Sequence, residues 1–240
     1  MRTRPSKTLF RIGRMLRAVP GMQYILTPMQ KRYWHKIAEN RNKAFLQNGL
    51  QILSEFDSIM QTNHIHYSLF AGTLLGAVRE GGFLKHDGDI DTLMFAKDYS
   101  PRIRQLLEEH GFKMVHAYLI EDGKLGREET YEKDNVSVDI YFAYEDKNFP
   151  TYQCDFFGEP ASPFQREHVI RARRLEFPIS YNVLRVPFES IEVNILDNAD
   201  EWLRCRYGED YMTPDPSFHD KGDNPHIFIW EGVKACMITT

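Results

Sequence analysis

The run His86-Asp87-Gly88-Asp89-Ile90-Asp91 is the part of the sequence best suited to chemistry. Residues i and i+2 of a strand point to the same side of a sheet, so Asp89 and Asp91 would face together while Ile90 faces the core. Two carboxylates held side by side repel each other, and a hard divalent cation relieves that repulsion. The spacing predicts a metal-binding pair, although a D-x-D pattern alone is also typical of a solvated turn.

A third acid, Asp139, lies between Val138 and Ile140 in a second apolar segment. These two neighbours have to face the core, which leaves the carboxylate on the other side of the strand. If this strand is next to the one that carries the acidic run, Asp139 completes a cage of three carboxylates.

Upstream, Gly72 and Thr73 stand between a short strand candidate and a short helix candidate. Backbone amides at a helix N-terminus are suited to binding phosphate. A Gly-Thr turn is also an ordinary helix cap. Taken with the acids, this turn gives the layout of metal-dependent nucleotidyl and phosphoryl transfer.

The spacing of apolar residues predicts the elements that hold these side chains in place. Helical periodicity predicts one or two long helices over residues 31–61. Shorter helices are predicted over residues 74–79, 101–110 and 197–207. Strands are predicted over residues 66–70, 90–95, 112–120, 128–132, 136–144 and 151–157, with two more within 173–188. The middle of the chain should therefore be a mostly antiparallel sheet, and the Pro- and Asp-rich segment after Met212 is predicted to be coil.

Length and composition agree with one folded domain. The chain has 240 residues, 42% hydrophobic and 27% charged, which excludes collagen-like, coiled-coil and wholly disordered proteins. Charged residues interrupt every apolar run before it reaches the roughly 18 residues that a membrane-spanning helix needs. Cys154, Cys205 and Cys236 have neither disulfide-framework nor metal-site spacing and are predicted to be buried thiols in a reducing compartment. We expect one domain over residues 31–240 after a basic N-terminal arm over residues 1–30.

The N-terminal part of the chain is strongly basic. Residues 1–43 hold eleven Lys and Arg residues and one acid, a formal charge of +10, while the rest of the chain carries −14. A helix there would carry four apolar residues on one face, as in helices that lie on a membrane surface: Leu9, Ile12, Leu16 and Val19. The sequence leaves open whether residues 1–20 contact an anionic membrane or pack on the domain. No nucleic-acid partner is predicted, because the body of the protein is acidic and has no recognised binding motif.

The segment with the acidic run resembles the signature of the LicD/fukutin family of phosphotransferases. Residues 67–79 read YSLFAGTLLGAVR, residues 82–84 read GFL and residues 87–91 read DGDID. The family usually has G-T-L-L-G-x-x-R, Gly-Phe-Ile/Leu and W-D-D-D-I-D in this register. His86 stands where the family has Trp, and Gly88 stands where it has the middle Asp. The metal pair is retained, and the two differences predict that the loop before it shapes a different substrate pocket.

The resemblance extends more weakly over residues 64–214. Its later matches are Val138-Asp139-Ile140, Trp202-Leu203, Tyr207-Gly208 and Pro214. It says nothing about the basic arm.

This resemblance implies a nucleotidyltransferase-like fold of the α/β (α+β) class, with a mixed sheet, flanking helices and an N-terminal helical extension. Residues 31–240 would form a LicD-like catalytic domain. The implied activity is transfer of a phosphorylated alcohol, such as phosphocholine, ribitol phosphate or glycerol phosphate, from a CDP-activated donor to a sugar hydroxyl of a surface glycan, with release of CMP. Mg²⁺ or Mn²⁺ at the carboxylates would supply the charge neutralisation that phosphate chemistry needs.

With this resemblance, the acids and the Gly-Thr turn receive roles. Asp89 and Asp91 are assigned to the metal, and Asp139 is either the third metal ligand or the base that accepts the proton of the acceptor hydroxyl. The plainer interpretation is that they are surface acids. Gly72 and Thr73 are expected to hold a donor phosphate, or to form only a structural turn.

The neighbouring cationic residues are candidates for substrate contact. Arg79 would balance phosphate charge, or would only pair with Glu80 or Asp87. Lys85 and His86 border the acids and are expected to contact the donor or the acceptor, whereas a His is more often a surface or core residue.

Two other functions stay open. A nucleotidyltransferase that transfers a nucleotide from an NTP to a small molecule would release pyrophosphate instead of CMP. An inactive relative would bind sugar or nucleotide without turnover, which the intact acids argue against. The favoured interpretation is a cytoplasmic enzyme of surface polysaccharide synthesis, held at the inner face of the membrane by its basic arm.

Overall fold

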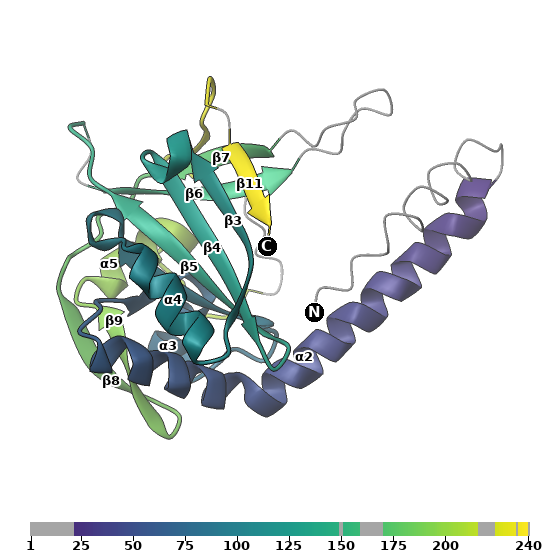
Figure 1. The fold of residues 1–240 in the computed structure, drawn as a ribbon, viewed down its shortest axis with the longest axis horizontal. Helices are drawn as coiled ribbons and strands as arrows, with labels where there is room; N and C mark the ends of the chain where they lie inside the picture. Colours follow the sequence, from purple (N-terminus) through teal and green to yellow (C-terminus); the bar gives the residue numbers. More distant parts are fainter. Residues whose placement is uncertain (1–21, 149–150, 159–169, 216–223, 234, 240) are drawn as a thin grey trace.

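The computed structural model describes residues 22–148, 151–158, 170–215, 224–233 and 235–239 (Figure 1). The amphipathic pattern predicted within residues 1–20 lies outside the described residues. The elements below are therefore those of the described ranges.

Four helices flank the sheet: α2 (Met22–Thr62), α3 (Ala71–Glu80), α4 (Pro101–Glu109) and α5 (Ala199–Tyr207). All four overlap the helices predicted from the sequence, although α2 begins at Met22 rather than at residue 31. The first is one continuous helix that passes residue 30 without a break, and Figure 1 shows its N-terminal half extending away from the sheet. At α4, Pro101 occupies the first turn and the Ser100 side chain accepts a hydrogen bond from the Arg102 amide, a regular N-terminal cap.

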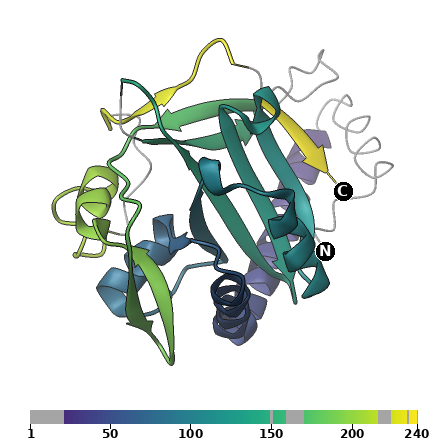
Figure 2. The ribbon, with the colours of Figure 1, turned by 60° about the vertical axis from the view of Figure 1, so that its left-hand side comes forward.

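A nine-stranded mixed sheet forms the centre of the molecule. Its strands are β1 (Ser68–Leu69), β2 (Asp89–Phe95), β3 (Lys113–Ile120), β4 (Gly126–Lys133), β5 (Val136–Tyr144), β6 (Tyr152–Gly158), β7 (Ile170–Leu175), β10 (Ile227–Ile229) and β11 (Ala235–Thr239). The order is β1-β2-β5-β4-β3-β11-β7-β10, and β6 pairs with both β5 and β7. The sheet therefore curls back on itself, which is visible in both views (Figures 1 and 2). Of the strand pairs in the described residues, β2–β5 is parallel and the others are antiparallel.

The prediction of coil after Met212 was wrong, because β10 and β11 form there. Both strands are short and pair with segments far away in the chain: Met237 lies opposite Tyr118, and Ile229 lies opposite Arg173. The stabilising partner of such a strand is not visible in the local sequence pattern.

A separate hairpin packs beside the sheet. It consists of β8 (Val183–Phe188) and β9 (Ile191–Leu196), and the second of these strands was not predicted. Arg185 holds the hairpin to α2 through an ion pair with Asp57, with an Nη1–Oδ1 distance of 2.5 Å. The Tyr67 hydroxyl and the Gln61 side-chain amide also donate to Asp57, so this buried carboxylate has three side-chain partners.

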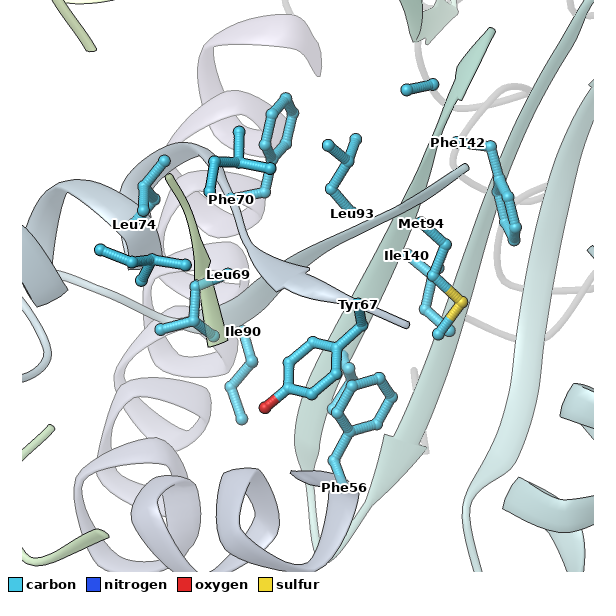
Figure 3. Packing of buried hydrophobic residues seen from close by; sticks show 14 of the residues in the cluster. Phe56, Tyr67, Leu69, Phe70, Leu74, Ile90, Leu93, Met94, Ile140 and Phe142 are labelled. Carbon is cyan, nitrogen blue, oxygen red and sulfur yellow. The ribbon is translucent and has the colours of Figure 1, made fainter. Parts of the chain in front are cut away.

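Part of the buried core lies between the sheet and α2. Phe56 of α2 packs edge-on against Tyr67, with ring centroids 5.2 Å apart. Figure 3 shows both rings in one cluster with Met94 of β2 and Ile140 of β5. Since successive strand residues alternate between faces, Met94 and Ile140 lie on the face opposite to Asp139. Helix α2 therefore covers the face of the sheet that does not carry the acids.

The acid-bearing face is covered at one end by α3 and α5. Phe70, the residue before α3, lies 4.4 Å from the Trp202 ring of α5 and 5.7 Å from the Tyr141 ring of β5, measured between centroids. These aromatic contacts fix the start of α3 against the strand that carries Asp139. Within the described residues, no helix is both long and apolar enough to cross a bilayer.

Candidate active site

Three acids meet on one face of two parallel strands. The register of β2 and β5 pairs Asp91 directly with Asp139. Asp89 lies two residues before Asp91 and shares its face, while Ile90 between them is fully buried. The structure thus brings the three carboxylates together on neighbouring strands, where the sequence placed them, and their chemical role stays a prediction.

Mutual repulsion shapes the electrostatics of this cluster. Burial and the charges of the neighbouring acids, Asp89 first among them, raise the pKa of Asp91 well above its ordinary value. Burial also raises the pKa of Asp87 to about 6. These groups are costly to ionise in the absence of a compensating positive charge, so the cluster is suited to binding a cation.

The N-terminus of α3 is locked onto the acids. The Gly72 amide donates to Oδ2 of Asp91 at 3.2 Å, and the Asp91 amide donates to Oγ1 of Thr73 at 2.9 Å. A carboxylate at a helix N-terminus is stabilised by the orphan amides and by the helix dipole. Both residues predicted to hold a phosphate therefore contact Asp91 in this structure, and Thr73 is almost fully buried.

A cavity of about 1030 Å³ opens beside the acids. Its walls are α3, the loop between α3 and β2, the start of β2 and the segment that follows α5. The predicted site residues that line it are Gly72, Arg79, Lys85, His86, Asp89 and Asp91. Two predicted residues, Thr73 and Asp139, are not among the residues of its wall.

Basic side chains line this cavity together with its acids. The Arg79 side chain pairs with Glu80 at 3.2 Å and donates to the Tyr211 carbonyl at 3.4 Å. The ion pair with Glu80 is the plainer interpretation of Arg79, which also lines the cavity, and its role toward phosphate stays a prediction. Lys85 and His86 are exposed and line the same cavity.

Two parts of the cavity wall were missed as site residues by reasoning from the sequence. Asp87 lines the cavity, and its Oδ2 accepts a hydrogen bond from the Leu84 amide at 2.8 Å. The sequence carried a signal for Asp87, because Asp87 continues the i, i+2 spacing of Asp89 and Asp91. The segment from Tyr207 to Asp215 closes the cavity from the C-terminal side, and it contains the Tyr-Gly and Pro matches to the family pattern.

Another missed acid lies one strand further along the sheet. Glu128 of β4 is 8% exposed, and its Oε2 has no hydrogen-bond partner among the described residues. Burial, followed by the charge of Asp139, raises the pKa of Glu128 well above its ordinary value. The sequence offered a signal, because adjacent acids in a strand, Glu128 and Glu129, cannot both face solvent.

The acids fit a divalent cation by donor type and by charge. Asp89, Asp91 and Asp139 offer carboxylate oxygens, which Mg²⁺ and Mn²⁺ prefer. Among the described residues, no group of three or more Asp, Glu, His or Cys side chains is already arranged to hold a metal ion. Cation binding would therefore rearrange side chains on a backbone that already pairs Asp91 with Asp139.

Comparison with known families agrees with this geometry. Residues 64–193 match the family model described as LicD/FKTN/FKRP, nucleotidyltransferase domain. This segment is more than half of the chain and contains both acid-bearing strands, the start of α3 and the three basic residues that line the cavity.

Similar curated proteins come from animals and bacteria. The chain is 22% identical over 225 residues to "Ribitol-5-phosphate transferase FKTN" of Mus musculus, an alignment that covers 90% of this chain and 45% of that protein. It is 44% identical over 50 residues to "Lipopolysaccharide cholinephosphotransferase LicD" of Haemophilus influenzae, covering 21% of this chain and 19% of the relative. A stretch of 55 residues is 46% identical to "Uncharacterized protein T07A5.1" of Caenorhabditis elegans, covering 23% and 14%. The chain spans less than half the length of the curated relatives it matches.

Proposed function

The chain belongs to the LicD/FKTN/FKRP family, and on this premise we propose that it is a metal-dependent phosphotransferase that uses a CDP-activated alcohol. The proposal rests on the acid cluster, in which Asp89 and Asp91 of β2 lie beside Asp139 of the parallel strand β5, next to a cavity that is also lined by basic side chains. The donor alcohols to be tested are choline, ribitol and glycerol. The names of the relatives, a ribitol-5-phosphate transferase and a cholinephosphotransferase, support the first two.

The proposed reaction moves one phosphate together with its alcohol. The oxygen of a sugar hydroxyl on a surface glycan forms a bond to the phosphorus that carries the alcohol. The bond from that phosphorus to the oxygen shared with CMP breaks, and CMP leaves with the electron pair. The proton of the sugar hydroxyl passes to a carboxylate of the site or to water.

The acids of β2 and β5 are suited both to binding a cation and to accepting a proton. Asp89, Asp91 and Asp139 would hold Mg²⁺ or Mn²⁺, which when bound neutralises charge on the phosphates. Asp139 is also a candidate to accept the proton of the acceptor hydroxyl, since a general base has to lie within hydrogen-bond reach of the reacting group.

The remaining cavity residues would bind and orient the donor. The side chains of Arg79, Lys85 and His86 offer positive charge or N–H donors to its phosphates. Gly72 would hold the helix start close to the acids through its backbone amide, which donates to the Asp91 carboxylate at 3.2 Å. Thr73 would act indirectly, because its hydroxyl oxygen accepts a hydrogen bond from the backbone amide of Asp91.

We further propose that residues 1–20 hold the protein at an anionic membrane surface. The support is the clustering of six Lys and Arg residues there, together with the apolar pattern of the same segment. An enzyme held at the inner face of the membrane would be close to lipid-linked glycan acceptors.

The products of the reaction test the proposed function. The protein is incubated with CDP-choline, CDP-ribitol or CDP-glycerol, a glycan acceptor and Mg²⁺ or Mn²⁺, and CMP is quantified. CMP release that depends on both the acceptor and the cation is the expected result. Pyrophosphate release from an NTP, with no CMP from any donor, would show a nucleotidyltransferase, and no turnover with retained donor binding would show an inactive relative.

A further inference from the structure

A row of polar residues crosses the sheet from the acids to β3. In the strand register, Asp91 lies opposite Asp139, Asp139 lies opposite Thr130, and Thr130 lies opposite His116. Directly paired residues share a face of the sheet, so one residue from each of four neighbouring strands joins the row on the acid-bearing face. Along this row, Thr130 and His116 therefore follow Asp139 on the side away from Asp91.

Hydrogen bonds connect the row. The Thr130 hydroxyl donates to Oδ1 of Asp139 at 2.5 Å, and Oγ1 of Thr130 lies 3.2 Å from Nε2 of His116. A hydroxyl carries a single proton, which is used on the carboxylate, so the imidazole has to be the donor in the second bond. His116 therefore carries a proton on Nε2.

Burial makes this chain of hydrogen bonds a rigid support. Thr130 is 2% exposed and His116 is 3% exposed, whereas Asp139 is half-buried. The Thr92 hydroxyl adds a bond of 3.0 Å to the Asp139 carbonyl and fixes the backbone at the same point. One buried hydroxyl therefore holds a carboxylate oxygen of Asp139, and another holds its backbone. The carboxylate has little freedom to rotate as a result.

We infer that Thr130 and His116 are positioning residues that hold the Asp139 carboxylate in the orientation needed to bind the divalent cation. This inference rests on the proposed function, because it assigns the two residues to the same acid cluster. Outer hydrogen-bond partners orient metal ligands in this way, and their loss typically weakens metal affinity about 10- to 100-fold. Both residues lie within residues 64–193, which match the family model, but neither is among the residues that carry the family signature.

The test compares matched Thr variants of the full chain. Thr130→Val keeps the shape of the side chain but removes the hydroxyl, and Thr130→Ser keeps the hydroxyl. The control is Thr151→Val, because Thr151 is also 2% exposed and its hydroxyl also makes buried hydrogen bonds, to the Phe177 carbonyl and from the Ile179 amide. Each protein is titrated with Mn²⁺ alone by calorimetry, and its melting temperature is recorded.

The inference predicts a specific pattern. Thr130→Val should bind Mn²⁺ about 10- to 100-fold more weakly than wild type. Thr130→Ser and Thr151→Val should keep wild-type affinity, although Thr151→Val should melt at a lower temperature. In the metal-free wild-type protein, ¹⁵N NMR should show the His116 proton on Nε2.

Several outcomes would overturn the inference. Equal losses of melting temperature in Thr130→Val and Thr151→Val, with unchanged Mn²⁺ affinity in both, would show that Thr130 is only structural. A His116 proton on Nδ1 would contradict the hydrogen-bond chain. If wild type binds Mn²⁺ but releases no CMP from any donor, the proposed function fails while the affinity comparison still decides the role of Thr130. If wild type binds no Mn²⁺, the positioning role fails together with the metal assignment.

Discussion

At the scale of single residues, the acid cluster makes a direct prediction. Asp89→Asn should lower kcat of CMP release by at least about 100-fold, since the loss of one preorganised electrostatic group costs about that much. The melting temperature should stay near wild type, because the neutral amide removes repulsion with Asp91. Steady-state kinetics and thermal unfolding of the same samples check this prediction.

Asp98→Asn is the matched control for this variant. Asp98 lies just after the same strand, in η1 (Ala96–Asp98), where it is exposed and outside the cavity wall. It should keep wild-type turnover. An Asp89→Asn enzyme that keeps more than about a tenth of wild-type kcat would contradict a role in electrostatic stabilisation of that size.

The raised pKa values predict a pH dependence of the metal-free protein. Asp87 has a pKa of about 6 in the folded state, above that of an Asp in an unfolded chain. Its folded form therefore holds a proton more tightly, so the stability it contributes is present below the unfolded pKa and is lost as pH rises through 6. Asp91 acts in the same direction. We expect the melting temperature of the metal-free protein to fall as pH rises from 5 to 7, past the Asp87 pKa of about 6.

Two further measurements test whether ionisation of these carboxyls causes the decline in melting temperature. Asp87→Asn should flatten the decline, because the amide does not titrate, whereas Asp98→Asn should keep the wild-type profile. Mn²⁺ should reduce the decline in wild type by compensating the ionised carboxylates. A melting temperature that rises over this pH range would contradict the assigned pKa direction.

Residue identity alone predicted part of this cluster. The alternation of Asp89, Ile90 and Asp91 was enough to place both carboxylates on one face, and apolar neighbours were enough to orient Asp139. The adjacent acids Glu128 and Glu129 gave a signal for a buried carboxyl, but the position of Glu128 and Thr130 beside Asp139 depends on pairing with β5, and strand order is not written in the local sequence.

At the scale of elements, the packing of α3 predicts that one Gly-to-Ala substitution destabilises the protein, although Ala has the higher helix propensity. Gly76 lies inside α3, where Ala would ordinarily stabilise the helix by about 1 kcal/mol. A Cβ at Gly76 would, however, lie 2.5 Å from the Gly82 carbonyl oxygen, a backbone atom that cannot rotate away. We expect Gly76→Ala to lower the free energy of unfolding by about 1–3 kcal/mol, the usual cost of overpacking.

Urea unfolding measures this effect, with Gly88→Ala as the control. No atom lies within 4 Å of a Cβ placed at Gly88, so that variant should stay within about 0.5 kcal/mol of wild type. Because the Gly82–Leu84 segment leads into the cavity rim, Gly76→Ala should also raise KM for the donor. Equal stability of the two variants would show that the contact between α3 and Gly82 does not constrain the loop.

The elements themselves were predictable where their signal is local. Helix α4 has a Ser cap, an initial Pro and a closing Gly111 with a φ of +87°, and β5 has the bounds that its pattern predicted. Strands β9 to β11 were missed, because each is stabilised by pairing with a partner rather than by its own pattern. The C-terminal strand pairs with β3, which is more than a hundred residues away in the chain.

At the scale of the whole molecule, charge is separated along the chain. The first 43 residues carry +10 and the remainder carries −14, and the acid cluster lies in the negative part. A negatively charged body is repelled by an anionic bilayer, so attachment has to come from the basic N-terminal part. We expect the full chain to sediment with vesicles that contain anionic lipid and to be released by salt.

Removal of residues 1–20 tests this expectation. The deletion takes away six Lys and Arg residues, each worth about 1 kcal/mol near an anionic surface, and the four apolar residues of the amphipathic pattern. The shortened protein should stay in the supernatant, yet it should release CMP with a soluble acceptor at the wild-type rate, because the cavity wall begins at Gly72. A companion variant with the six bases replaced by Gln separates the two contributions, since it keeps the apolar residues and loses only the charge. Unchanged sedimentation of the shortened protein would show that the arm does not bind the membrane, and loss of turnover with the soluble acceptor would show that it packs on the domain.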